Sequence, residues 1–111
     1  MLFKNTTLSL FAALALAAKA ANAADIAVPE WVLPYEGAKE LEATVGDVIT
    51  FDWTGGHNVY IHPTGDCSLD GAILVGSKTG ASYTFVDADA GTSMFFSCDI
   101  GNGAHCRVGE Y

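Results

Sequence analysis

A stretch near the end of the sequence, residues 95–110, constrains the fold more than any other. It begins as an apolar run that leads to Cys98, continues through a glycine-rich loop and returns His105, with Glu110 five positions further on as a possible oxygen ligand. This order of residues is typical of a metal-binding loop. Upstream, His57 opens a second apolar run, residues 57–61, which we expect to be a strand. Two imidazoles and one thiolate form the trigonal donor set that suits copper in electron-transfer sites, with a weak fourth ligand on the axis.

The first 23 residues are expected to be a signal peptide. Lys4 precedes an apolar run at 8–18, and Ala21-Asn22-Ala23 has the small residues typical of a signal peptidase site. The run is shorter than the roughly 20 apolar residues of a membrane span. We therefore expect a secreted chain without a membrane span, whose mature part is one domain of 88 residues, 24–111. A domain near this lower size limit gains from a crosslink or a metal.

The expected mature chain is strongly acidic. It retains three basic residues against all thirteen acids, which gives a formal charge of −10. Such a polyanion repels nucleic acid and acidic membranes, and its field favours a partner with a cationic docking surface. The acids would equally serve solubility alone, and the composition leaves both roles open.

The chain has three cysteines, an odd number for a secreted protein. One disulfide would leave one thiol unpaired, and an unpaired thiol in an oxidising compartment is reactive unless something occupies it. A metal bound by Cys98 would occupy the thiol that one disulfide leaves unpaired. The residues alone also allow an intermolecular disulfide or an inert buried thiol at Cys98.

Short apolar runs separated by glycine-rich turns predict the fold class. The alternation of Ile49, Phe51 and Trp53 with polar neighbours has the period of a half-buried strand, with these three side chains facing inward. His62 falls on the opposite face from His57 and is expected to be a surface residue. The expected strands are 26–33 at a sheet edge, 41–45, 48–53, 57–61, one beginning at Tyr83 and 92–98, while 72–75 suits a strand or one helical turn. This spacing predicts an all-β sandwich or barrel of Greek-key type.

Several of these motifs resemble the phytocyanins, the family of small secreted blue copper proteins that includes stellacyanin and plantacyanin. The matching residues span nearly the whole expected mature chain: Val45-Gly46-Asp47, Phe51-Asp52-Trp53, His57-Asn58-Val59, Cys67, Phe95-Phe96-Ser97-Cys98 and His105-Cys106-Arg107-Val108-Gly109. The adjacent pair His105-Cys106 is the most specific of them. The resemblance implies a cupredoxin-like Greek-key fold that carries single electrons and is not an enzyme.

The resemblance also implies roles for individual residues. One type 1 copper ion would be held by His57, Cys98 and His105, with Glu110 at the axial position, and Cys67 would pair with Cys106 in a disulfide. The implied outer contacts are Asn58, which in cupredoxins ties the two ligand segments together by hydrogen bonds, and Ser97 beside the thiolate. The electrons would be exchanged with a redox partner protein or a small-molecule reductant.

The sequence departs from the phytocyanin pattern in three places. Six residues separate Cys98 from His105 where the family usually has four, and Glu110 replaces the usual axial Met or Gln. The sequence also ends at Tyr111, where relatives continue into a strand that completes the sheet. We therefore expect an open sheet edge at this place, which invites pairing with another chain.

Three other functions compete with that of a copper electron carrier. A structural zinc site built from Cys67, Cys98, Cys106 and a histidine lacks the closely spaced ligand pairs that such sites use. A multicopper oxidase would need clustered His-x-His pairs, and none of the three histidines forms one. The remaining alternative is a copper-free binding or structural protein of the cell surface with the same fold.

Overall fold

The computed structural model describes residues 1–5 and 23–111. Its strands are β1 (Leu2–Asn5), β2 (Asp25–Val28), β3 (Glu40–Ala43), β4 (Val48–Phe51), β5 (Val59–His62), β6 (Ile73–Gly76), β7 (Ala81–Thr84) and β8 (Ser93–Ser97). In these two described ranges the helical segments are one-turn pieces, η2 (Asp87–Asp89) and α2 (Ala104–Arg107). The prediction of an all-β fold is therefore confirmed. Of the predicted signal peptide, residues 6–22 lie outside the described residues, and its cleavage after Ala23 stays a prediction.

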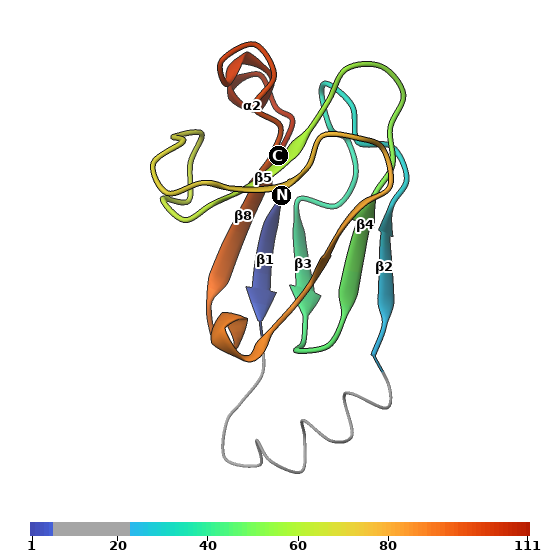
Figure 1. The fold of residues 1–111 in the computed structure, drawn as a ribbon, viewed down its shortest axis with the longest axis vertical. Coiled ribbons are helices and arrows are strands. Elements are labelled where there is room, and N and C mark those ends of the chain that lie inside the picture. Colours follow the sequence, from blue (N-terminus) through green and yellow to red (C-terminus); the bar gives the residue numbers. More distant parts are fainter. Residues whose placement is uncertain (6–22) are drawn as a thin grey trace.

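The strands form two mixed sheets with the orders β3-β1-β8-β5-β6 and β2-β4-β7 (Figure 1). Aromatic side chains join the sheets. The ring of Phe51 from β4 stacks on that of Phe96 from β8 with centroids 5.6 Å apart, and Tyr83 from β7 meets Phe96 edge-on at 6.0 Å. The two sheets therefore pack face to face as in a β-sandwich. The Greek-key connection stays a prediction.

The alternation in β4 has the predicted effect on packing. Ile49, Phe51 and the following Trp53 are buried, and the exposed fraction of the first two is 0 %. Their polar neighbours lie on the other face, so this strand contributes one apolar side to the core. The region at 72–75, which suited a strand or a helical turn, overlaps β6 in three of its four residues, and β7 begins two residues before the predicted start at Tyr83.

The expected open sheet edge is filled by β1. This strand runs between β3 and β8, parallel to β3 with Phe3 opposite Leu41, and antiparallel to β8 with Phe3 opposite Met94. The Phe3 side chain is fully buried, and its ring centroid lies 5.0 Å from Phe85. In the uncleaved chain the first residues supply both the backbone partners and an aromatic side chain for this edge. Cleavage after Ala23 would remove β1, so the open edge expected of the mature chain stays a prediction.

His62 is also placed differently from the prediction, which put it on the surface. Its exposed fraction is 1 %, and its ring Nδ1 lies 2.7 Å from the carbonyl oxygen of Ser68 in the loop between β5 and β6. Because a carbonyl can only accept, Nδ1 carries the proton, and in the neutral ring Nε2 accepts from the Ser97 hydroxyl at 2.5 Å. Strand parity assigned the face of the sheet correctly, but the loop folds back and covers that face.

Candidate metal centre

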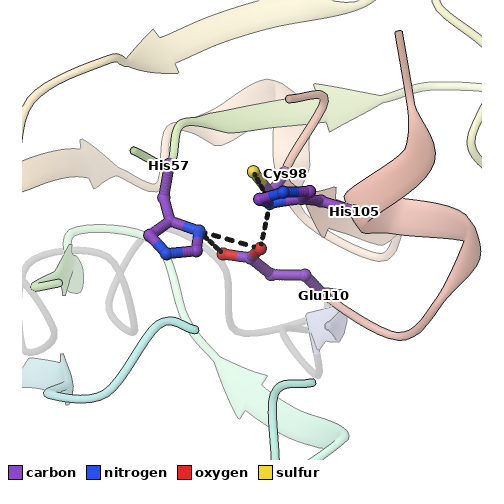
Figure 2. Close-up of side chains that lie close together, drawn as sticks. All are labelled: His57, Cys98, His105 and Glu110. Atoms are coloured by element: carbon purple, nitrogen blue, oxygen red, sulfur yellow. Dashed lines mark hydrogen bonds and ion pairs between the residues drawn. The ribbon is translucent and has the colours of Figure 1, made fainter. Parts of the chain in front are cut away.

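Four side chains from separate segments converge at one end of the sandwich. His57 precedes β5, Cys98 follows β8, His105 belongs to α2, and Glu110 comes after that helix (Figure 2). One potential ligand atom from each of them, two ring nitrogens, one sulfur and one carboxylate oxygen, lies within 4.8 Å of all the others. The structure thus brings together all four residues that the sequence nominated as ligands.

Both imidazoles point the same nitrogen at the same carboxylate. The Nδ1 atom of His57 lies 3.0 Å from Oε1 and 2.9 Å from Oε2 of Glu110, and Nδ1 of His105 lies 3.0 Å from Oε1. Although His57 is this close to Oε2, no hydrogen bond satisfies that oxygen, and the Glu110 side chain is fully buried. A buried carboxylate oxygen without a donor is costly unless a cation or another group compensates it. A metal ion bound by these side chains would supply that compensation.

Cys98 contributes the thiol from the buried side of the cluster. Its Sγ lies 3.6 Å from Nδ1 of His105 and accepts a hydrogen bond from the backbone N–H of Asn58 at 3.4 Å. Burial is the main cause that raises the pKa of this thiol to about 11, and the nearby Glu110 carboxylate adds to the shift. Without a metal the sulfur is therefore a neutral thiol at pH 7, and binding of a metal as thiolate would release its proton.

The backbone between Cys98 and Glu110 closes the site. The N–H of Cys98 donates to the carbonyl of Glu110 at 3.0 Å, and the N–H of Glu110 donates to the carbonyl of His105 at 2.9 Å. Gly109 lies between α2 and Glu110 with a φ of 118°, a conformation that glycine adopts far more readily than other residues. This residue lets the chain turn back so that the Glu110 side chain enters the cluster.

Asn58 connects the two segments that carry His57 and Cys98. Its side-chain oxygen accepts a hydrogen bond from the backbone N–H of Asp99 at 2.7 Å, and its own N–H points at the Cys98 sulfur. Its carbonyl accepts from the indole of Trp31 at 2.9 Å, which anchors this segment to the core. These are the contacts expected of a group that fixes the orientation of neighbouring metal ligands.

A disulfide joins Cys67 to Cys106, with the two Cα atoms 5.8 Å apart, and so confirms the predicted pair. Because Cys106 follows His105 directly, the bridge ties the helix α2 to the loop that covers His62. Cys98 is the free cysteine of the described chain, and its burial opposes an intermolecular disulfide.

The two histidines are the solvent-facing side of the cluster. The exposed fraction is 23 % for His105 and 11 % for His57, against 0 % for the Glu110 side chain. Val108, the residue that follows the end of α2, is also exposed. A partner could therefore approach the cluster along the imidazole edges but not along the thiol.

Two features of this region were not predicted. The helix α2 has only four residues, too few for a helical period to show in the sequence. The second feature is the buried hydrogen bond between His62 and Ser97, the residue that precedes Cys98. The sequence predicted Ser97 only as a neighbour of the thiol. The sequence signal for this pair was Cys67. Its disulfide to Cys106 holds the loop that contains Ser68, and the carbonyl of Ser68 contacts the His62 ring of β5.

Comparison of the chain with protein-family models, with curated proteins and with solved structures finds no significant match. The β-rich fold, the His, Cys, His, Glu cluster and the disulfide are compatible with a cupredoxin.

Proposed function

We propose that this chain is a copper protein of the phytocyanin type that carries single electrons by cycling between Cu(II) and Cu(I). The observation that carries the proposal is the convergence of two imidazole nitrogens and one cysteine sulfur within 4.8 Å, with the Glu110 carboxylate as the fourth group. Two imidazoles and a thiolate suit copper in electron-transfer sites, where the metal cycles between two oxidation states.

The chain's own residues have distinct tasks in this function. His57, Cys98 and His105 would hold the ion, and the buried Oε2 of Glu110 would be a further ligand or a compensating charge. The hydrogen bond from Asp99 to Asn58 holds the first two ligand segments in one arrangement. A set of ligands that does not move between oxidation states keeps the reorganisation small, which favours rapid electron exchange.

The partner that fits this function is a redox protein or a small reductant that contacts the exposed edge of His105. A cationic docking surface would suit the acidic composition of the chain. The disulfide is compatible with a secreted protein, and on this ground we propose an extracellular location. Within the described ranges, no helix is long and apolar enough to cross a membrane.

Titration of the purified chain with copper tests the proposal. We expect one copper ion per chain, a strong visible absorption from thiolate-to-copper charge transfer and a Cu(II) paramagnetic resonance signal. Cys98→Ser should abolish the visible band, whereas His62→Gln, a matched change at the histidine outside the cluster, should retain it. A chain that binds copper without a visible band, or with the band intact in Cys98→Ser, would contradict the assignment.

The same titration separates the alternatives. Zinc binds similar donors and gives no visible band, so preferential binding of zinc with colourless copper binding would indicate a structural zinc site. Failure to bind either metal would indicate a copper-free binding or structural protein of the cell surface.

A further inference from the structure

The edge strands of the two sheets differ in how well they are protected. In the described chain these are β3 and β6 in the larger sheet and β2 and β7 in the smaller one. Charged side chains on an edge strand keep it from pairing with another chain, and β3 carries Glu40 and Glu42 while β2 carries Asp25. The strand β7 exposes the polar Ser82 and Thr84. The sequence of β6, Ile-Leu-Val-Gly, contains neither a charged nor a polar side chain.

The exposed part of β6 is apolar on both faces. The side chains of Ile73 and Leu74 are 58 % and 51 % exposed, and neighbouring residues of a strand point to opposite faces. One edge of β6 pairs with β5, and no other strand of the described chain pairs with it. A Cβ on Gly76 would lie 2.6 Å from the Ala81 side chain, so this end of the strand is closed by β7. The open edge is therefore Ile73–Val75.

Two opposite charges flank this strand at equal distances from its centre. Asp70 lies four residues before Leu74 and Lys78 lies four residues after it, and both charged residues are exposed. Residues 23–111 contain three cations. Lys39 and Arg107 each donate to a backbone carbonyl, whereas no partner contacts Lys78 in the described chain. The Asp70 carboxylate has no partner among the described residues either.

An antiparallel pair of two β6 strands centred on Leu74 would bring these groups together. In such a pair Leu74 lies opposite Leu74 of the second copy, and Ile73 lies opposite its Val75. Because positions 70 and 78 are equally far from position 74, Asp70 of each copy falls beside Lys78 of the other. The edge is thus complementary to itself in both apolar side chains and charge, as a two-fold interface requires.

We propose that two copies of this chain associate through β6 as an antiparallel strand pair centred on Leu74, with Asp70 and Lys78 forming an ion pair across each end. The interface uses none of the four residues of the candidate metal centre, so it is independent of the proposed copper function. The paired edge is short and both copies carry an excess of acids, so we expect a reversible dimer whose population depends on protein concentration.

Sedimentation velocity of the full chain over a range of concentrations tests the proposal. Asp70→Lys and Lys78→Asp each place like charges at both ends of the pair, so each variant should dimerise at least tenfold more weakly than the unchanged chain. An equimolar mixture of the two variants should recover the dimer, because the lysines of one chain then meet the aspartates of the other. Asp87→Lys, the same change of charge in η2, should leave dimerisation unchanged.

A further variant tests the centre of the pair without its flanking charges. Leu74→Glu replaces an exposed side chain and brings two carboxylates together at the two-fold axis, so it should abolish the dimer while the thermal midpoint of the monomer changes little. A chain that stays monomeric up to about 1 mM would overturn the proposal. So would a dimer that persists in Leu74→Glu, or a mixture of the two charge variants that dimerises no better than either alone.

Discussion

Acetylation of the Met1 amino group should remove a pH dependence of stability that the free amino group creates. In the folded chain its pKa is lowered from 8.0 to about 4, first by burial and then by the charge of Lys39. Between these two values the unfolded chain binds a proton that the folded chain does not. Stability must therefore rise with pH from about 4 to 8, and it is flat outside this window.

The size of the effect follows from the width of the window. One group whose protonation differs between the two states contributes up to about 1.4 kcal/mol per pH unit, and this slope falls off as the pH approaches the unfolded-state pKa of 8.0, so we expect about 2 kcal/mol between pH 6 and pH 8. The other ionisable groups, including Lys39 before β3 and Glu40 opposite Leu2, are common to the free and the acetylated chain, so their contributions cancel in a comparison of the two.

The assay is urea denaturation of both chains at several pH values from 6 to 8. The readout is the difference between the two pH slopes and not the offset, because the acetyl group also changes the packing in the slot. The free chain should gain stability toward pH 8 relative to the acetylated chain. Parallel slopes would show that the Met1 amino group is not buried in the folded chain.

Three further predictions concern the other end of the sandwich. Replacing Cys67 and Cys106 together by serine opens a loop with a sequence separation of 39. In the chain-entropy model this should lower the free energy of unfolding by about 4 kcal/mol, and a loss below about 1 kcal/mol in denaturation experiments would contradict the model. Gly109→Ala forces a side chain into a φ of 118° and should weaken copper binding at least tenfold in competition titrations, while equal affinity would show that this turn does not position Glu110. In the copper-loaded chain, Glu110→Met and Glu110→Gln should both raise the reduction potential, because a neutral group stabilises Cu(II) less than a carboxylate does; unchanged potentials in both variants would exclude Glu110 as a ligand.

Much of the sandwich could be predicted because its information is local. Ile49 and Phe51 show the period of a half-buried strand within a few residues, and both are fully buried. Strand parity also placed His62 on the face opposite His57. Whether that face is covered depends on a loop drawn back by a disulfide to a residue 39 positions away, and no local pattern contains this information.

The candidate site was likewise predictable in its residues but not in its geometry. The residue types and their order nominated His57, Cys98, His105 and Glu110, because few patterns combine a thiol and two imidazoles in this way. The sequence could not show that both imidazoles face Glu110 through Nδ1, nor that its Oε2 is buried without a hydrogen bond. Those features depend on side-chain directions set by the turn at Gly109.

The strand β1 was not among the expected strands, because it lies in a segment expected to be removed before the chain is mature. Its place is set by the acceptor: β3 and β8 each present one edge, and the core between them has room for the Phe3 side chain against Phe85 and Phe96. The carbonyl of Glu110 lies along the same edge of β8, where it accepts from the N–H of Cys98 at 3.0 Å. What the sheet requires at this position is an extended segment with alternate apolar side chains, and the buried Met1 and Phe3 meet this requirement in the uncleaved chain.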